Sequence, residues 1–402
     1  MIKGIIANMW QKIKNIYHLL VAVLANFIFW FPARKLTVIG VTGTDGKTTT
    51  VSLIYHILKE SGENVSMITS IGAKIKQKKY DTGYHVTTPG PFYLQKMLRQ
   101  AVSSKNNYFV LEVTSHAIDQ FRIWGIPFKV GVITNITNEH LDYHKTYDNY
   151  FKTKEKLIRI SDTAVVNQDD SSYNRLRESV TNKFKENWIS YGLTNTSDIN
   201  PEIFPLKDHN LIGEFNKYNI LAAVSVCKNL GISDEKINKA LKTFVLPVGR
   251  LDFVYEKDFK VMIDFAHTAN AFQTVLSSIR PFVSGKIIHV FGSAGERDSL
   301  KRPLLGEISS NFSDIIILTS EDPRSEDANK IIDEIKSGMS NEKVEVIKII
   351  DRKEAIAAAI QMASKNDLVL ITGKAQEKSM NYGKGEELWD EYEAVKEALE
   401  KK

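Results

Sequence analysis

The sequence has very little cysteine, and this absence excludes two kinds of site. Among its 402 residues Cys227 is the one cysteine, and it lies in the apolar stretch 220–227. A single thiol can form neither an internal disulfide nor a four-cysteine zinc ribbon. We therefore expect Cys227 to be a small residue of the core.

Long stretches of one charge are also missing. The formal net charge is +5, but the 53 lysines and arginines are scattered along the chain. We find no basic stripe with interleaved aromatic residues, so we expect no nucleic-acid partner. A mildly basic surface favours anionic small molecules or a membrane face.

The N-terminal region lacks an apolar run of the length that a membrane span needs. Residues 19–31 are apolar except for Asn26, and a helix of this length extends about 20 Å against a hydrocarbon core of about 30 Å. Residues 31–35 make a poor signal-peptide cleavage site. Two interpretations of the hydrophobic segment 1–34 stay open beside a true span, which we favour least. It is a helix packed on the protein body, or an interfacial membrane anchor whose basic flank includes Lys3, Lys12 and Lys14.

Residues 38–50 combine an apolar run, glycines and a Lys-Thr pair that opens a helical pattern. Gly43 and Gly46 would let backbone N–H groups approach phosphate oxygens, although Gly43 comes two residues later than in the common phosphate-loop spacing. The helix N-terminus adds partial positive charge, Lys47 adds a full charge, and the Thr48 hydroxyl can ligate Mg²⁺. This pattern predicts a nucleotide-binding turn between a strand and a helix.

Strand-like and helix-like patterns alternate from residue 35 onward. The expected strands cover residues 36–41, 65–69, 108–113, 130–134 and 163–167, and the expected helices cover 47–61, 91–102, 147–160, 217–230 and 234–243. Continuous apolar strands are typical of parallel sheets that are covered on both faces. We therefore predict an α/β fold in which residues 35–246 form a central P-loop-type ATPase domain with a mostly parallel, doubly wound sheet.

The pattern changes near residues 247–250. Beyond them lie a hairpin-like pair of segments and four further alternations of strand and helix, with strands expected at 251–255, 259–264, 286–291, 314–319, 344–350 and 367–372. The length is sufficient for a second, smaller domain. We predict that residues 247–402 form a C-terminal Rossmann-like domain.

Two groups of polar side chains follow buried strands. Glu112 ends the strand at 108–113, and a carboxylate beside a phosphate loop is a natural Mg²⁺ ligand. The segment 134–144 places His140 among other histidines and carboxylates, which suggests a second cation.

The order of these motifs resembles the Mur ligases, a family of ATP-dependent ligases that form amide bonds in cell-wall peptide synthesis. The motifs are Gly43-Thr44-Asp45-Gly46-Lys47-Thr48, Thr87-Thr88-Pro89, Glu112-Val113-Thr114-Ser115-His116 and Asn138-Glu139-His140-Leu141-Asp142-Tyr143-His144. The resemblance extends from about residue 35 to the C-terminus. Within the family it is strongest to the enzymes that add the third residue to UDP-N-acetylmuramoyl dipeptide. It implies ATP and Mg²⁺ as cofactors, and a muramoyl peptide and a free amino acid as substrates.

The resemblance also implies roles for individual residues. Thr48 and Glu112 would serve one Mg²⁺, and His140 and a carbamylated Lys154 would serve a second. Lys47, Glu112, His140, Lys154 and Arg250 would be catalytic. ATP would contact Gly43, Thr44, Asp45, Gly46, Lys47, Thr48, Thr49, Asn216, Asn219, Arg250, Asp264 and His267, with Asn219 reading the adenine.

The two remaining substrates would be held by separate groups of residues. The acceptor peptide would contact Thr87, Thr88, Ser115, Gln120 and Arg122. The incoming amino acid would contact Arg297, Asp322, Arg324, Gly373 and Glu377. Arg324 would grip the distal carboxylate of meso-diaminopimelate, whereas Asp322 stands where relatives carry asparagine, so lysine and ornithine stay open.

The N-terminal part departs from the family pattern. About 35 residues precede the nucleotide-binding strand, fewer than the usual uridine-binding domain needs. We therefore leave open a nucleotide-linked or a lipid-linked muropeptide as acceptor. We expect a monomer in the cytoplasm, with peripheral membrane contact through residues 1–33 at the inner face of the membrane. The alternatives are a related ligase acting on a pseudomurein-type peptide, folate or another polypeptide, a cell-wall amidation subunit, and a membrane-associated nucleotide-binding scaffold.

Overall fold

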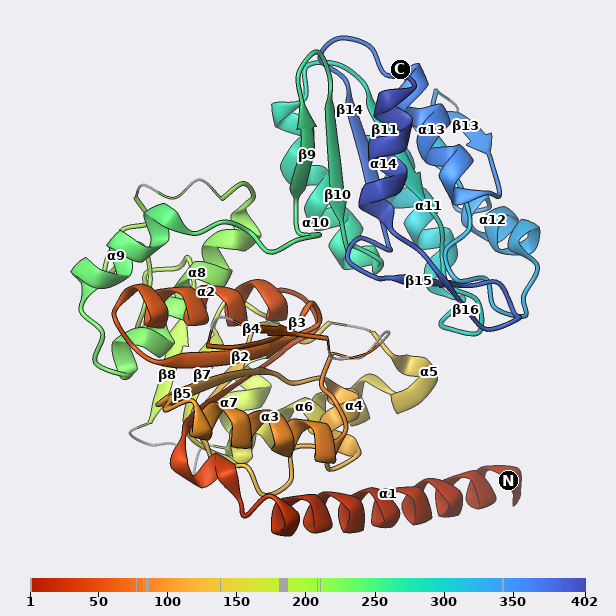
Figure 1. The fold of residues 1–402 in the computed structure, drawn as a ribbon. Coiled ribbons are helices and arrows are strands. Elements are labelled where there is room, and N and C mark those ends of the chain that lie inside the picture. Colours follow the sequence, from red (N-terminus) through yellow and green to blue (C-terminus); the bar gives the residue numbers. More distant parts are fainter. Residues whose placement is uncertain are drawn as a thin grey trace. The chain divides into compact units, whose positions relative to one another are not determined.

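A computed structural model describes residues 2–76, 78–81, 83, 87–137, 139–180, 187–207, 209, 211–341 and 343–402, without the side chains of residues 2–13, 141 and 142. The chain forms two compact units (Figure 1). The first comprises residues 1–139, 144–211 and 215–245, and the second comprises residues 140–143, 212–214 and 246–402. The finer division predicted above, with boundaries after residues 34 and 246, stays a prediction.

The first unit is built on an eight-stranded sheet in the order β4-β3-β2-β5-β1-β6-β7-β8. Its strands are β1 (Thr37–Thr42), β2 (Val65–Thr69), β3 (Gly72–Ile75), β4 (Lys78–Tyr80), β5 (Tyr108–Glu112), β6 (Phe128–Ile133), β7 (Ser161–Asn167) and β8 (Trp188–Tyr191). Six neighbouring strands from β2 to β8 are parallel, and β3 and β4 add an antiparallel edge. The central strands are buried, as expected for a sheet that is covered on both faces.

Helices cover both faces of this sheet (Figure 1), with α2 and α9 on one face and α3 and α6 on the other. The helices are α1 (Ile2–Ile28), the 3₁₀ turn η1 (Pro32–Lys35), α2 (Lys47–Glu60), α3 (Pro91–Ser103), α4 (Ser115–Asp119), α6 (Tyr147–Arg159), α7 (Tyr173–Val180), α8 (Glu214–Asn229) and α9 (Asp234–Thr243), while α5 (Leu141–His144) spans the boundary between the units. Thr114, Thr146 and Ser233 cap the N-termini of α4, α6 and α9 by accepting a backbone N–H bond.

Helix α1 packs along α3. Ala22, Ala25 and Asn26 are fully buried, and Ala33 after the helix joins the core around α3. The segment is therefore a helix docked on the first unit, which is one of the two interpretations left open above. None of the helices that the structure describes combines the length and the apolar character needed to cross a membrane.

The second unit is built on a six-stranded sheet in the order β13-β12-β11-β14-β10-β9. Its strands are β9 (Asp252–Glu256), β10 (Lys260–Asp264), β11 (Ile287–Phe291), β12 (Ile315–Leu318), β13 (Glu345–Lys348) and β14 (Leu368–Thr372), followed by the separate pair β15 (Ser379–Asn381) and β16 (Glu386–Leu388). Strand β9 is antiparallel to β10 and the other pairs of the large sheet are parallel. The helices are α10 (Ala269–Ile279), the 3₁₀ turn η2 (Arg280–Phe282), α11 (Lys301–Phe312), α12 (Ala328–Lys336), α13 (Arg352–Met362) and α14 (Glu391–Glu400).

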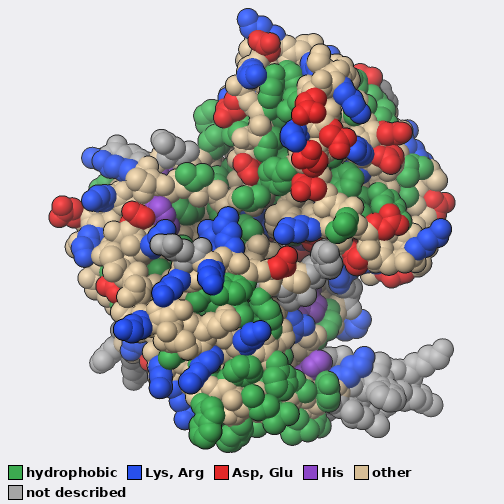
Figure 2. All heavy atoms as spheres, viewed as in Figure 1, with side chains coloured by type: hydrophobic (Ala, Val, Ile, Leu, Met, Phe, Trp, Pro, Cys, Tyr) green, Lys and Arg blue, Asp and Glu red, His purple; other side chains and the backbone are tan. Residues whose placement is uncertain are grey.

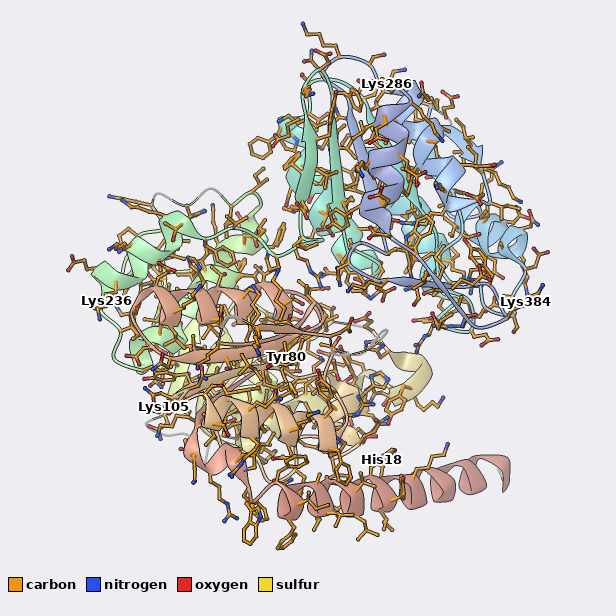
Figure 3. All side chains as sticks on the ribbon, in the orientation of Figure 1. His18, Tyr80, Lys105, Lys236, Lys286 and Lys384 are labelled. Atoms are coloured by element: carbon orange, nitrogen blue, oxygen red, sulfur yellow. The ribbon has the colours of Figure 1, made fainter. Side chains whose placement is uncertain are left out.

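The predicted α/β class, with two mostly parallel sheets, is confirmed. Figure 3 shows how densely the helices and sheets of each unit are covered by side chains, with Tyr80 and Lys105 labelled on the first and Lys286 and Lys384 on the second. The carboxyl ends of parallel strands form one edge of each sheet. Ligands bind at this edge in doubly wound folds, and most predicted site residues lie there.

Candidate functional site

The phosphate loop follows β1 directly. Gly43 and Gly46 adopt positive φ values of 155° and 80°. A Cβ atom on Gly43 would lie 1.8 Å from Thr134 Oγ1, and one on Gly46 would lie 2.4 Å from Asn219 Oδ1. Both positions therefore require glycine, for the backbone angle and for the space.

Neighbouring polar groups hold this loop in shape. The backbone N–H groups of Thr44 and Asp45 donate to Asn135 Oδ1 at 3.1 and 2.9 Å. Lys47 Nζ donates to the carbonyl oxygens of Gly43 and Thr44 at 3.0 and 2.6 Å. The Lys47 ammonium thus lies over the loop where a polyphosphate would bind.

A hydroxyl and a carboxylate meet beside the loop. Glu112 pairs with Val41 across β5 and β1, and its two carboxylate oxygens accept the Thr48 hydroxyl at 3.0 and 3.1 Å. Ser70 adds a hydroxyl 3.1 Å from Thr48 Oγ1 and donates its backbone N–H to Glu112. These oxygen atoms fit the preference of Mg²⁺ for hard ligands. Thr49 is buried in the same helical turn.

Lys154 lies on α6, fully buried beneath the phosphate loop. Its Nζ donates to the Gly43 carbonyl oxygen at 2.6 Å and lies 4.6 Å from the centre of the Tyr150 ring. Burial, and then the nearby Lys47 ammonium, hold the pKa of Lys154 well below its ordinary value. Such an amine is readily present in its neutral form.

His140 precedes α5 and has a φ of 54°. Among the residues that the structure describes, His, Cys, Asp and Glu side chains do not gather in groups of three or more that could hold a metal ion. Asn138 of the same motif lies outside the described residues. The second Mg²⁺ site therefore stays a prediction.

The predicted acceptor residues gather at the end of β5. Thr88 donates its hydroxyl to the Glu112 carbonyl oxygen at 2.8 Å, and Arg122 Nη1 donates to the Thr88 carbonyl oxygen at 2.7 Å. Arg122 Nε and Nη2 both bind Gln120 Oε1, at 3.0 and 2.6 Å. Thr87 is half-buried next to Thr88. One strand end thus carries both the metal-site carboxylate and the acceptor residues.

Ser115, the remaining predicted acceptor residue, contacts a histidine. This histidine belongs to a quoted sequence motif, but no role was predicted for it. Its Oγ lies 3.0 Å from His144 Nε2. The His144 ring packs 5.2 Å from the Tyr150 ring, centre to centre, and the Tyr150 hydroxyl lies 3.2 Å from Thr44 Oγ1. A continuous chain of contacts therefore joins Ser115 to the phosphate loop.

Asn216 and Asn219 are buried on α8. Asn219 Nδ2 donates to Asn216 Oδ1 at 3.0 Å, and Asn219 Oδ1 accepts the Thr50 hydroxyl at 3.3 Å. The bond from Thr50 ties α8 to the first turn of α2. That Asn219 hydrogen-bonds adenine stays a prediction. To do so, the Asn219 amide would have to share its bonds to Asn216 and Thr50 with the base, or give them up.

In the second unit, Asp264 organises the turn after β10. Its carboxylate accepts the backbone N–H groups of Leu251 at 2.8 Å and Ala266 at 2.7 Å. The Arg250 guanidinium lies 4.9 Å from the centre of the Phe265 ring. His267 Nδ1 lies 2.9 Å from the Phe265 carbonyl oxygen. Arg250, Asp264 and His267 are therefore brought together.

The predicted amino-acid residues mostly gather at the carboxyl ends of β12 and β14. Lys374 Nζ donates to Asp322 at 2.9 Å and to Glu377 at 2.7 Å. Arg324 Nη1 donates to the Gly295 carbonyl oxygen at 2.5 Å. Arg297, by contrast, is exposed on the loop after β11. Lys374 is fully buried, and its one positive charge is shared between Asp322 and Glu377.

Glu321 is a buried carboxyl in the same cluster. A Cβ atom on Gly373 would lie 2.1 Å from Glu321 Oε2, so glycine is required there for the carboxyl to fit. Burial raises the pKa of Glu321 to about 7, against the opposing effect of Lys301, Arg352 and Lys374.

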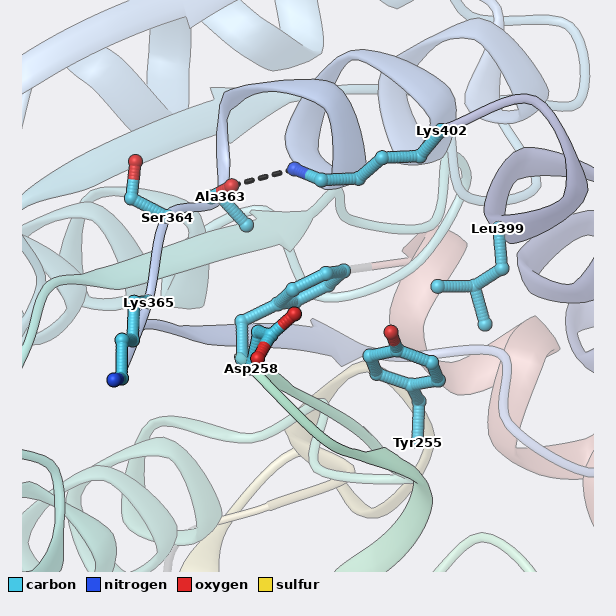
Figure 4. Close-up of a pocket in the computed structure, with 8 residues that line it drawn as sticks. Tyr255, Asp258, Ala363, Ser364, Lys365, Leu399 and Lys402 are labelled. Atoms are coloured by element: carbon cyan, nitrogen blue, oxygen red, sulfur yellow. Dashed lines mark hydrogen bonds between the residues drawn. The ribbon is translucent and has the colours of Figure 1, made fainter.

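A surface hollow of about 410 Å³ lies in the second unit, at the amino ends of β10 and β14 (Figure 4). Phe259, Ala363 and Lys365 line it, and Lys402 Nζ donates to the Ala363 carbonyl oxygen at 2.5 Å. Phe259 precedes β10, and Ala363 and Lys365 precede β14 in the chain. The hollow therefore lies away from the strand ends that carry the predicted site residues.

Comparison with protein families agrees with this geometry. Residues 41–227 match the Mur ligase middle domain, and residues 249–375 match the Mur ligase glutamate ligase domain. UDP-N-acetylmuramoyl-L-alanyl-D-glutamate--2,6-diaminopimelate ligase 1 of Clostridium acetobutylicum is 37% identical over 94% of this chain and 81% of its own. The chain belongs to the Mur ligase family. The predicted enzyme class, an ATP-dependent, ADP-forming ligase that makes amide bonds, is confirmed.

Other relatives support the same assignment. The UDP-N-acetylmuramoyl-L-alanyl-D-glutamate--2,6-diaminopimelate ligase of Aquifex aeolicus is 39% identical over 88% of this chain and 75% of its own. A solved structure of a ligase with that same description matches at 27% identity with a TM-score of 0.62, covering 91% of this chain and 78% of the other. These relatives place the chain among the ligases of peptidoglycan synthesis.

The sequence motifs did not single out several side chains that shape this Mur ligase site. Asn135 and Ser70 brace the phosphate loop, His144 contacts Ser115, and Lys374 pairs with Asp322. His144 stands inside a quoted motif and Lys374 stands between the predicted residues Gly373 and Glu377, so their position was a signal. Ser70 follows a strand end without any motif, and sequence offers no sign of it.

Proposed function

We propose that the protein couples a diamino acid to a muramoyl peptide, with meso-diaminopimelate as the amino acid. The proposal is carried by the Thr48–Glu112 pair beside the phosphate loop, in a chain that is 37% identical to a ligase named for 2,6-diaminopimelate. Arg324 in the same cluster supports this choice. Its guanidinium can bind the distal carboxylate that meso-diaminopimelate has and that lysine and ornithine lack.

The reaction follows from the chemistry of an acyl phosphate. The acceptor carboxylate attacks the γ-phosphorus of ATP and ADP leaves. The amine then attacks the acyl carbon, phosphate leaves, and the amine loses its proton. Lys47 and Arg250 would offset the charge on the transferring group, and Mg²⁺ at Thr48 and Glu112 would neutralise the triphosphate.

Lys154 would carry a carbamate in the working enzyme, and would complete with His140 a second Mg²⁺ site. A neutral amine combines with CO₂, losing one proton, to give an anionic oxygen ligand. The buried position and lowered pKa of Lys154 favour the neutral amine that this step needs. The carbamate would replace the present bond from Nζ to the Gly43 carbonyl oxygen. A carbamate signal in ¹³C NMR after incubation with ¹³C-bicarbonate, absent in Lys154→Arg, tests this.

The remaining contacts follow the resemblance. Thr87, Thr88, Ser115, Gln120 and Arg122 would hold the acceptor, which is nucleotide-linked or lipid-linked. We also propose that the protein acts as a monomer in the cytoplasm, at the inner face of the membrane, with residues 1–33 in peripheral contact.

Phosphate release over a panel of amino acids and acceptors tests the function. Stimulation by meso-diaminopimelate with a muramoyl dipeptide, and its loss in Lys47→Ala, is the expected result. Stimulation by a folate, or by a pseudomurein-type or other peptide, would assign a different acceptor. Hydrolysis of ATP that responds to no amino acid would favour a nucleotide-binding scaffold.

A further inference from the structure

Helix α1 has two chemically distinct faces. Ala22, Ala25 and Asn26 are fully buried against the first unit. Tyr17, Leu20, Leu24 and Phe27 follow helical spacing and are 54% to 64% exposed. The exposed apolar side chains of this region, called the α1 face below, are Ile16, Tyr17, Leu20, Leu24, Phe27, Ile28 and Trp30.

The α1 face is a continuous surface rather than scattered residues. Hydrophobic side chains gather over the described part of α1 in Figure 2, at the bottom of the view. A large apolar patch on a protein surface marks an interaction site. Aromatic side chains such as Tyr17, Phe27 and Trp30 suit the boundary between headgroups and acyl chains.

The charged side chains of the N-terminal segment itself have one sign. The sequence contains no Asp or Glu before Asp45. Lys14, Arg34 and Lys35 are exposed next to the face, and Arg34 lies 4.3 Å from the centre of the Phe31 ring. Basic residues around an apolar helix face are attracted to anionic lipid headgroups.

Helix α1 is tied directly to the turn that carries the predicted acceptor residues. Asn26 Nδ2 donates to the Trp124 carbonyl oxygen at 2.9 Å, across 98 residues of sequence. A Cβ atom on Gly125 would lie 2.6 Å from Asn26 Oδ1, so the side chain fits this turn closely. Gln120 and Arg122 stand in the same turn. Anything that binds to α1 is therefore held near the predicted acceptor residues Gln120 and Arg122.

We propose that the α1 face lies on an anionic bilayer and that the acceptor is a lipid-linked muramoyl peptide presented at that surface. The second part rests on the ligase function proposed above. The first part specifies the membrane contact of residues 1–33 proposed there, and it does not depend on ligase activity. The helix binds with its exposed side in the headgroup region while its other side stays on α3. The membrane thereby delivers the acceptor to the turn at Gln120 and Arg122.

Vesicle binding tests the first part with the full-length chain. Phosphatidylglycerol vesicles should bind the protein at least tenfold better than phosphatidylcholine vesicles, and added salt should weaken the binding. The double variant L20E/L24E should lose binding at least tenfold. L388E, at a leucine that is 87% exposed in the second unit, is the matched control and should bind as the parent does.

Two results would overturn the membrane assignment. One is equal vesicle binding by L20E/L24E, L388E and the parent protein, provided that all three melt alike. The other is a parent protein that runs as a dimer without lipid while L20E/L24E runs as a monomer, because the α1 face would then bind a second copy.

Turnover with two acceptors tests the second part. The parent should work at least tenfold faster on a lipid-linked muramoyl dipeptide in vesicles than on the UDP-linked form, and L20E/L24E should remove that advantage while leaving the slower rate on the UDP-linked form. A parent that prefers the UDP-linked acceptor refutes the lipid-linked substrate. Inactivity of the parent on both acceptors, with vesicle binding intact, refutes the proposed function instead.

Discussion

His144 Nε2 and Ser115 Oγ lie 3.0 Å apart, so a histidine at the end of α5 contacts the first residue of α4. If the imidazole donates to Ser115, the serine hydroxyl hydrogen is directed away from His144. That hydrogen can then bind an oxygen of the acceptor. His144 would in this way position Ser115 without touching the substrate.

Replacing His144 should weaken acceptor binding through Ser115. His144→Leu removes the ring nitrogen, and the loss of one hydrogen bond, about 1 kcal/mol, should raise KM for the acceptor about fivefold with little change in KM for ATP. His144→Gln, whose amide reaches the position of Nε2, should restore much of the loss. Steady-state kinetics with each substrate varied in turn measures both effects.

The effect should disappear when Ser115 is absent. In a Ser115→Ala background, His144→Leu should add almost nothing to KM if the histidine acts through the serine. His56→Gln is the control, since His56 bonds to Ala240 and Thr243 on α9. Additive losses in the double variant would show that the two residues act separately.

Thr48 should matter through its hydroxyl alone. Thr48→Val keeps the shape but removes the oxygen that meets Glu112 and Ser70, so the predicted Mg²⁺ site loses a ligand. We expect turnover to fall at least 100-fold, and we expect the Mg²⁺ concentration that gives half-maximal activity to rise. Thr153→Val is the control, because the Thr153 hydroxyl donates to the Asn149 carbonyl oxygen of its own helix at 2.7 Å.

A Mg²⁺ titration of phosphate release separates these outcomes. Unchanged Mg²⁺ dependence in Thr48→Val would remove this hydroxyl from the metal site. A loss of the same size in Thr153→Val would point to a general effect of removing threonine hydroxyls from this unit.

Stability should fall as pH rises because of Glu321. Its pKa is raised to about 7 in the folded state from 4.5, so the folded protein holds a proton that the unfolded chain releases. This contribution is fully present below about pH 4.5 and is lost as pH rises toward 7, by up to about 3 kcal/mol. Urea unfolding of the parent and of Glu321→Gln at pH 5 and pH 8 measures it. The glutamine variant should show a smaller fall in the free energy of unfolding between the two pH values, and equal falls would contradict the assignment.

The buried pair Arg352–Glu391 should dominate the electrostatic stability of the second unit. Both side chains are fully buried, and Arg352 also donates to the Thr372 carbonyl oxygen at 2.7 Å. Glu391→Gln leaves an uncompensated buried charge and should destabilise the protein by about 3 to 5 kcal/mol. Glu397→Gln breaks the exposed pair with Lys353 and should have little effect. Denaturant unfolding compares them, and equal losses would contradict this reasoning.

Much of the fold could be predicted because buried parallel strands leave a strong apolar signal. Strands β1, β5, β7 and β14 begin and end within one or two residues of the predicted ranges. Strands β3, β4 and β8 were not predicted. Edge strands such as β4 are short and partly exposed, so their pattern is weak. The strands β15 and β16, which lie outside the main sheet, were also missed, because each has three residues, too few to show a pattern.

The site was harder to predict than the fold because side-chain partners depend on distant segments. The residues of one motif, such as Lys47 and Thr48, could be named from spacing alone. The bond between Lys374 and Asp322 joins positions 52 residues apart, and no local pattern contains it. Asp322 is thus paired with a lysine that sequence reasoning left without a role, and Glu377 shares that lysine.

Asn135 has a further consequence for affinity. Its side-chain oxygen already accepts the N–H groups of Thr44 and Asp45, two of the donors that a phosphate would seek. A phosphate that bound these two donors would therefore compete with the Asn135 amide oxygen. Asn135→Ala would release the N–H group of Asp45, whereas the backbone carbonyl oxygen of residue 135 would still accept that of Thr44.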